Sequence, residues 1–170
     1  MECVLIALGT NLGDRLANLG AALRGLDGPL RAIVASPVYE TAPRYVEDQP
    51  PFLNMAARAE TTLAPLDLLA ALKDIERTLG RKDGVRNGPR LIDLDIIFYG
   101  TRVLRLPGLT IPHPRLAERS FVLRPLADIA PTWRHPETSA TMTEMLAPIA
   151  DDPGVRLATR QLERIAASQG

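Results

Sequence analysis

Two aspartates, Asp93 and Asp95, are separated by one residue within the otherwise apolar segment 91–98. If this segment is a strand, both carboxylates lie on one face, with their Cβ atoms roughly 6.5–7 Å apart. Carboxylates at this separation can share hard cations that also bind phosphate oxygens. An exposed sheet face is the alternative for an isolated Asp-x-Asp, although two like charges in a strand need a reason to be there.

A cationic loop leads directly into this pair. It contains Arg81, Lys82, Arg86 and Arg90, opposed only by Asp83. Arginine side chains bind phosphate and carboxylate groups through a planar fork, whereas the alternative here is a solvated run of charge. A cationic loop followed by paired carboxylates suits a metal–polyphosphate complex, because the acids hold the metal and the arginines neutralise the phosphoryl oxygens.

The remaining short motifs give weaker evidence of a functional site. The glycine-containing turn 9–14 lacks the Lys-Ser/Thr of a P-loop, and Asp14 would repel phosphate at the start of the next helix, so we interpret it as a capped structural turn. His113 lies between two prolines. A lone histidine is more often structural, but this rigid setting favours a functional role, and His135 is expected at the surface. With Cys3 as the only cysteine, no Cys/His zinc site is expected.

Composition narrows the class of protein. The 170 residues correspond to one domain (1–170), 46% of the residues are hydrophobic, and 20 basic side chains balance 20 acidic ones. This balance predicts no nucleic-acid or membrane partner. The apolar run 3–8 is too short to span a bilayer, and it follows Glu2 rather than a basic segment, so no signal peptide is expected. A single cysteine is typical of a reducing compartment, which predicts a cytoplasmic location.

The spacing of apolar residues, together with capping residues, glycines and prolines, predicts the helices and strands that must position these residues. Strands are expected at 3–8, 31–41, 52–62 and 91–99, a helix between Asp14 and Gly28, and a second helix between Pro65 and Gly80. A hairpin (103–106 with 109–111) and helices at 115–127 and 143–150 should follow. This β-α-β-β-α-β order predicts a ferredoxin-like α+β sandwich with helices on one face and a C-terminal hairpin and helices added. The proline-rich loop 41–51 is long enough to be functional.

Segment 86–97 closely resembles the signature of the 6-hydroxymethyl-7,8-dihydropterin pyrophosphokinases, a family of folate-pathway enzymes. Further segments resemble other motifs of that family in the same order: 9–13, 39–43, 48–50, 52–56, Glu76 with Gly80-Arg81, 111–114 and 119–123. The resemblance covers nearly the whole chain. It implies a ferredoxin-like fold and the transfer of a pyrophosphoryl group from ATP to the hydroxymethyl oxygen of the pterin, with release of AMP.

The resemblance also implies residue roles. Two Mg²⁺ ions would be held by Asp93 and Asp95, which with Arg81 and Arg90 form the catalytic set. The ATP site would comprise Lys73, Glu76, Arg81, Arg86, Arg90, Ile96, Thr110, His113 and Arg119. The pterin site would comprise Thr41, Pro43, Arg44, Phe52, Asn54, Asp93 and Phe121. Pro114 and Gly108 stand where some family members have a Tyr and an Arg near the nucleotide.

The expected partners are therefore ATP and the reduced pterin, bound by a monomer. Two other classes of protein stay open. A nucleotidyltransferase with the same two-metal carboxylates would release pyrophosphate instead of AMP. A ferredoxin-like ligand-binding module would show no turnover, and it would have no use for the paired carboxylates beside an arginine loop.

Overall fold

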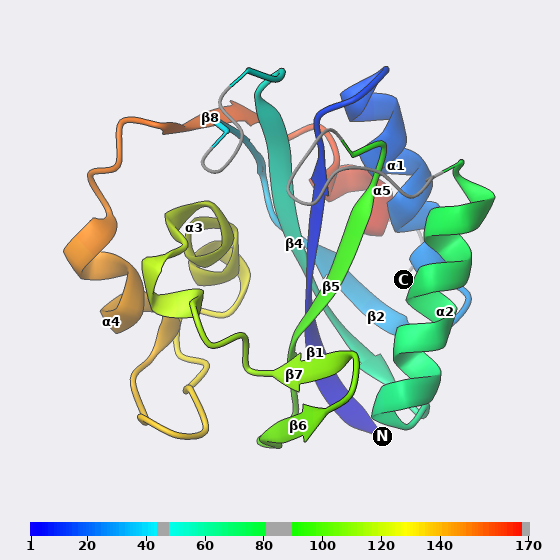
Figure 1. Cartoon of the computed structure of the whole chain (residues 1–170), viewed down its shortest axis with the longest axis vertical. Coiled ribbons are helices and arrows are strands. Elements are labelled where there is room, and N and C mark those ends of the chain that lie inside the picture. Colours follow the sequence, from blue (N-terminus) through cyan, green and yellow to red (C-terminus); the bar gives the residue numbers. More distant parts are fainter. Residues whose placement is uncertain (44–47, 81–89, 168–170) are drawn as a thin grey trace.

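A six-stranded sheet forms the centre of the molecule in the computed structural model, which describes residues 1–43, 48–80 and 90–167. Its strands are β1 (Glu2–Thr10), β2 (Arg31–Ala35), β3 (Val38–Thr41), β4 (Phe52–Thr61), β5 (Asp93–Tyr99) and β8 (Val155–Thr159). They follow the order β5-β1-β4-β3-β8, β2 also pairs with β4, and every pairing is antiparallel. The N-terminal strand β1 is therefore central, between β4 and β5 (Figure 1).

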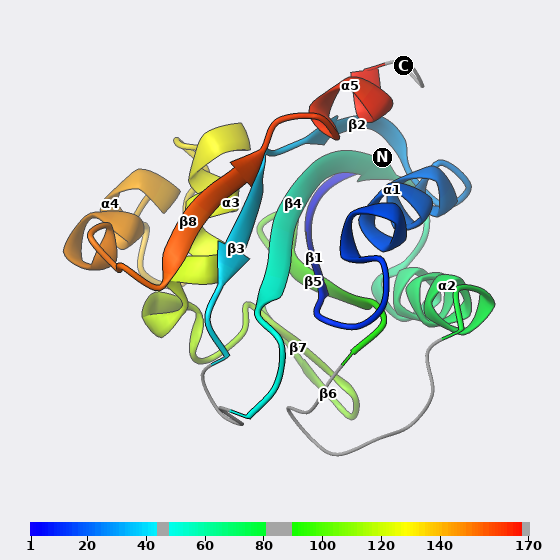
Figure 2. The same cartoon turned by 90° about the horizontal axis from the view of Figure 1, so that it is seen from above.

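Helices cover both faces of this sheet. The helices of the predicted β-α-β-β-α-β segment, α1 (Arg15–Leu26) and α2 (Pro65–Thr78), lie on one face, as expected. The later helices α3 (Ser120–Ile129) and α4 (Met142–Leu146) lie on the opposite face (Figure 2). The remaining elements are the hairpin β6 (Leu104–Leu106) and β7 (Leu109–Ile111), the 3-10 helices η1 (Leu116–Glu118) and η2 (Ala147–Ile149), and α5 (Glu163–Ala167).

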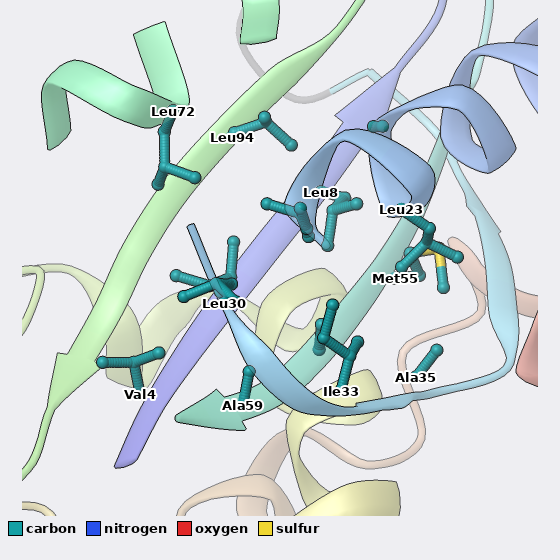
Figure 3. Packing of buried hydrophobic residues seen from close by; sticks show 14 of the residues in the cluster. Val4, Leu8, Leu23, Leu30, Ile33, Ala35, Met55, Ala59, Leu72 and Leu94 are labelled. Atoms are coloured by element: carbon teal, nitrogen blue, oxygen red, sulfur yellow. The ribbon is translucent and has the colours of Figure 1, made fainter. Parts of the chain in front are cut away.

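The larger core lies between the sheet and the first two helices. Leu23 of α1 and Leu72 of α2 are fully buried there, together with Leu8 of β1 and Leu94 of β5 (Figure 3). The leucines recur at helical spacing because that spacing places them on one side of each helix. This core fixes β1 and β5, the two strands that carry the glycine turn and the aspartates.

The helix ends confirm the predicted signals. The Asp14 side chain accepts a hydrogen bond from the Ala17 amide at 3.1 Å, which caps α1. Pro65 opens α2, and Gly80 ends it with φ = 96°, a left-handed conformation that favours glycine. The turn before α1 is thus fixed at both ends, by a strand and by a capped helix.

A bulge interrupts the alternation of β5. Its pairing with β1 shifts between Leu5 and Ile6, whose partners are Phe98 and Ile96. Ile97 and Phe98 consequently both pack in the core under α3, whereas Ile96 belongs to the core under α1 and α2. The two aspartates precede the bulge, so the alternation predicted for them is intact.

Several details differ from the sequence prediction, and the helices expected at 115–127 and 143–150 are each divided into an α-helix and a 3-10 helix. The expected strand 31–41 is divided into β2 and β3 at Ser36-Pro37, where the Ser36 hydroxyl accepts a hydrogen bond from the Ala56 amide at 2.8 Å. The last strand of the predicted unit begins at Asp93 instead of residue 91. The C-terminal strand β8 and helix α5 were not predicted, although β8 extends the sheet beyond β3.

Within the described ranges, no helix has both the length and the apolar character needed to cross a membrane.

Candidate active site

A cavity of about 550 Å³ opens where β1, β4 and β5 meet the hairpin and the start of α3. This volume lies within the range of small-molecule sites. Most of the predicted site residues line it together: Thr41, Phe52, Asn54, Lys73, Arg90, Asp93, Asp95, Ile96, Thr110, His113, Arg119 and Phe121. Residues that the sequence placed 80 positions apart therefore share one pocket.

The register of the sheet sets the floor of this pocket. Gly9 of β1 pairs with Asn54 of β4 on one side and with Asp93 of β5 on the other. Directly opposed residues point to the same face, so Asn54 and Asp93 flank the glycine across two strand spacings, about 10 Å. Ala7 lies between Ala56 and Asp95 in the same way. Small residues thus separate a polar amide from the paired carboxylates.

The carboxylate pair has an unfavourable excess of negative charge. The pKa of Asp95 is raised to about 7, first by loss of hydration in the cleft and then by the charges of Asp93 and Glu76. Lys73 and Arg119 oppose this rise. The Asp95 side chain is nevertheless open to the cavity. A carboxylate that is accessible and crowded by like charges is well suited to accept a cation.

The donor set fits Mg²⁺. Asp93 and Asp95 supply hard oxygen ligands, and residues 1–43, 48–80 and 90–167 contain no cluster of three or more His, Cys, Asp or Glu side chains that could hold a metal. Mg²⁺ is usually held by one or two carboxylates, with phosphate and water completing its coordination. Two carboxylates facing an open pocket therefore match a metal that arrives with a polyphosphate.

Glu76 of α2 binds the backbone of β5, the strand that carries the two aspartates. The residue is 2% exposed and its Oε1 accepts a hydrogen bond from the Leu94 amide at 2.9 Å. Lys73 Nζ lies 3.7 Å from Oε2 of the same carboxylate. The resemblance put Glu76 in the ATP site, but the described residues that line the cavity do not include it. Its contact is with the backbone between the two aspartates.

His113 is held as a neutral hydrogen-bond donor. Its Nδ1 accepts a hydrogen bond from the Arg115 amide at 3.0 Å, so in the neutral ring Nε2 carries the proton. Burial, Arg119 and Arg115 lower the pKa of His113 below its usual value. The Arg119 guanidinium also lies 5.8 Å from the centre of the Phe121 ring. Together these residues give one wall of the cavity donors for anionic oxygens.

Other residues of the cavity lining suit a flat polar ring. Asn54 Nδ2 donates to Thr41 Oγ1 at 2.6 Å, which orients the amide. Phe52 and Phe121 are half-buried and line the same cavity. A heterocycle can stack on aromatic rings while an amide satisfies its donors and acceptors.

Some predicted residues are not brought together with these. Pro43 is described but is absent from the cavity lining, and Arg44, Arg81 and Arg86 lie outside the described residues. Conversely, Gln49 lines the cavity and Asn11 is buried beside it, although neither residue was predicted to belong to the site. A polar residue directly after a buried strand was the signal that could have identified Asn11.

Comparisons with known proteins agree with this geometry. Residues 5–131 match the family described as 7,8-dihydro-6-hydroxymethylpterin-pyrophosphokinase (HPPK). A Pseudomonas aeruginosa 2-amino-4-hydroxy-6-hydroxymethyldihydropteridine pyrophosphokinase is 44% identical over 149 residues, which cover 86% of this chain and 91% of that protein. The mitochondrial folate synthesis bifunctional protein of Pisum sativum is 52% identical over 141 residues, 82% of this chain. Those residues are 27% of the pea protein, so the chain spans about a quarter of its length.

The fold is also found in solved structures. The crystal structure of wild-type HPPK-DHPS from Plasmodium falciparum with pteroate superposes with a TM-score of 0.71 at 18% sequence identity. The match covers 87% of this chain and 42% of that one. An α+β fold with an antiparallel sheet is thus shared at low identity, while the sequence matches extend through the cavity-lining segments. This chain belongs to the 7,8-dihydro-6-hydroxymethylpterin-pyrophosphokinase family.

Proposed function

We propose that this chain transfers pyrophosphate from ATP to the hydroxymethyl group of 6-hydroxymethyl-7,8-dihydropterin and releases AMP, a step of folate biosynthesis. The observation that carries the proposal is the row Asn54–Gly9–Asp93 on one face of the sheet. It separates an oriented amide from a carboxylate pair by about 10 Å. A flat ring bound at the amide would therefore extend its hydroxymethyl group toward a polyphosphate bound at the carboxylates.

The reaction requires one bond to form and one to break. The hydroxymethyl oxygen attacks the β-phosphorus of ATP, the bond from that phosphorus to the α–β bridging oxygen breaks, AMP leaves, and the hydroxyl proton is released. Such transfers depend on positioning and on stabilising charge. Asn54 and the two phenylalanines would orient the pterin, and Arg90, Arg119, Lys73 and neutral His113 would bind the phosphates.

Asp93 and Asp95 would hold Mg²⁺, for which we propose two ions bound with ATP. Bound Mg²⁺ neutralises polyphosphate charge and polarises phosphoryl oxygens. The raised pKa of Asp95 supports this assignment, because a cation beside the pair would relieve the repulsion that raises it. Glu76 would hold the two carboxylates in place, because it accepts a hydrogen bond from the amide of Leu94, the residue between them.

We also propose the finer features of the fold and of the site. The order β5-β1-β4, continued by β2 and β3, supports a ferredoxin-like topology for the β-α-β-β-α-β segment. We further propose that residues 1–170 act as one catalytic domain. The roles of Pro43, Arg44, Arg81 and Arg86, the monomeric state and the cytoplasmic location stay predictions from the sequence.

Product identification tests the function. The protein is incubated with ATP, Mg²⁺ and the reduced pterin, and the nucleotide products are separated. AMP together with pyrophosphorylated pterin is the expected result. Release of pyrophosphate would identify a nucleotidyltransferase instead, and binding of the pterin without turnover would identify a ligand-binding module.

A matched pair of variants tests the site. Asp93→Ala should lower turnover at least ~100-fold, because a charged ligand of the metal–polyphosphate complex is lost. Asp74→Ala is the control, since Asp74 is exposed on α2 and forms a surface ion pair with Arg77. Equal turnover in the two variants would remove Asp93 from the catalytic machinery.

A further inference from the structure

Asn11 lies directly after β1 and is 1% exposed, yet its side chain is fully engaged in hydrogen bonds. Its Oδ1 accepts from the Arg90 amide at 2.7 Å. Its Nδ2 donates to Gln49 Oε1 at 2.9 Å and to the Pro50 carbonyl at 3.0 Å. The Asn11 amide also donates to the Arg90 carbonyl at 3.0 Å. One buried side chain thus contacts two segments that are 40 residues apart.

These two segments belong to different halves of the proposed active site. Gln49 and Pro50 end the proline-rich loop that precedes Phe52, and Gln49 lines the cavity. Arg90 ends the arginine loop that precedes the aspartates, and it lines the same cavity. The proline-rich loop belongs to the predicted pterin side, and Arg90 to the predicted phosphate side. Asn11 is therefore a direct link between the two substrate sites.

The chemistry of the amide makes this link specific. An asparagine offers an acceptor and two N–H donors on one small rigid group, and here the acceptor serves one segment while both donors serve the other. Aspartate would lack the donors, and serine or alanine could not contact both segments at once. Because the group is buried, displacement of one segment leaves a polar atom of Asn11 unpaired, or, if Asn11 follows, breaks its hydrogen bonds to the other segment.

We propose that Asn11 couples the two substrate sites, so that a nucleotide bound at Arg90 also fixes Gln49 and Pro50 for the pterin. Asn11 is a positioning residue, since its side-chain contacts are with the backbone and with Gln49. The proposal rests on the proposed function, because it names ATP and pterin as the ligands of the two segments. Reciprocity follows: the pterin must favour nucleotide binding by the same factor.

Calorimetry measures this coupling directly. The affinity for 6-hydroxymethyl-7,8-dihydropterin is determined without and with a saturating non-hydrolysable MgATP analogue, and the ratio of the two affinities is the coupling factor. Linked sites typically give factors of about 5 to 150. The native chain should show a factor in this range, and Asn11→Ala should bring it close to one. A coupling factor unchanged by Asn11→Ala would overturn the proposal, as would a native chain that binds both ligands with no coupling.

A matched control separates coupling from anchoring. Arg15 Nη1 donates to the Pro51 carbonyl at 2.9 Å and Nη2 pairs with Glu40 at 3.1 Å, so Arg15 holds the proline-rich segment through contacts that do not involve Arg90. Arg15→Ala should weaken pterin binding equally with and without the nucleotide. If Arg15→Ala also abolished the coupling factor, Asn11 would not be the link.

Hydrogen exchange provides a readout that needs no substrate. In the free protein, Asn11→Ala should speed exchange of the Arg90 amide at least about tenfold, because that amide loses its acceptor. Arg15→Ala should leave the Arg90 amide as in the native chain. This arm stays informative if the chain proves not to bind pterin, an outcome that would instead count against the proposed function.

A second variant covers the case in which Asn11→Ala does not fold. Gln49→Met keeps the length of the side chain but removes the Oε1 acceptor, so Asn11 loses its contact with Gln49 and keeps those with Pro50 and Arg90. It should lower the coupling factor severalfold while the Arg90 amide keeps its native exchange rate. A native coupling factor in Gln49→Met would contradict the proposed route through Asn11.

Discussion

Gly9→Ala should weaken pterin binding selectively, because Gly9 lies beside the amide proposed to bind the pterin. A Cβ added at Gly9 would lie 2.9 Å from Asn54 Oδ1, a separation that real Cβ atoms do not adopt. The other atoms nearest to it, the Leu53 carbonyl oxygen at 3.9 Å and Asn54 Cγ at 4.0 Å, are in ordinary contact. The Asn54 amide would therefore have to move, together with its 2.6 Å hydrogen bond to Thr41.

The magnitude follows from one displaced buried hydrogen bond. Leaving a buried donor or acceptor unpaired costs about 1–3 kcal/mol, which corresponds to pterin binding about 5 to 150 times weaker. The stability of the fold should change little, because alanine is favoured over glycine in a strand by about 0.5–1 kcal/mol and offsets part of the strain. At this chain length such changes move the melting temperature by no more than about 4 °C.

Calorimetry with the reduced pterin and, separately, with a MgATP analogue tests this reasoning. Affinity for the analogue should be unchanged, since the three atoms nearest the new Cβ include none of Asp93. Gly20→Ala is the control, because a Cβ at Gly20 in α1 would meet only ordinary contacts at 3.5–3.8 Å, with side-chain atoms of Arg24, Leu162 and Ile165. If Gly9→Ala binds pterin like the native chain while Asn54→Ala binds it weakly, the steric argument is wrong.

Three further predictions concern other groups. Asp95→Asn should lower turnover at least ~100-fold while the melting temperature is maintained or raised, because like charges are removed; a loss of fold would show in thermal denaturation. The pKa of His113, measured by NMR titration of the free protein, should lie below the usual histidine value near 6.5, and a pKa above 6.5 would contradict the burial argument. A second titration with the anionic MgATP analogue bound should give a higher pKa. The pKa of Tyr39 is raised to about 12, first by burial and then by its hydrogen bond to Asp128. The unfolded chain therefore loses this proton near pH 10 while the folded chain retains it, so stability should fall as pH rises from 10 to 12, and Tyr39→Phe should flatten that fall in denaturation measured against pH.

The parts of the fold that depend on local patterns were predictable. The shared face of Asp93 and Asp95 follows from two-residue alternation, and the ends of α2 follow from Pro65 and Gly80, each of which acts on its own neighbours. The hairpin β6–β7 was predicted for the same reason. Such signals can be interpreted without knowing which strands pair with one another.

The parts that depend on pairing between distant segments were not predictable from pattern alone. The row Asn54–Gly9–Asp93 requires the register of three strands far apart in the sequence. The residue pattern alone gave no role to Glu76, and only the family resemblance assigned it to the nucleotide. Its hydrogen bond from the Leu94 amide depends on the packing of α2 against β5, which no local pattern reveals. The strand β8 has mostly exposed residues, so its apolar alternation is too weak to reveal a pairing with β3 across more than 100 residues.

The central place of β1 also has a consequence for synthesis of the chain. The side chains of Val4, Leu5, Ile6 and Leu8 are at most 1% exposed in the folded protein, and the strands that bury β1 edgewise are β4 and β5. At about 5–20 residues per second, translation of the roughly 90 residues from β1 to the end of β5 takes on the order of 5–20 s. For that time at least one edge of this strongly apolar strand lacks the strand that pairs with it in the folded protein. Such strands are prone to aggregation, so the emerging polypeptide should be a substrate for ribosome-associated chaperones until Tyr99 has emerged.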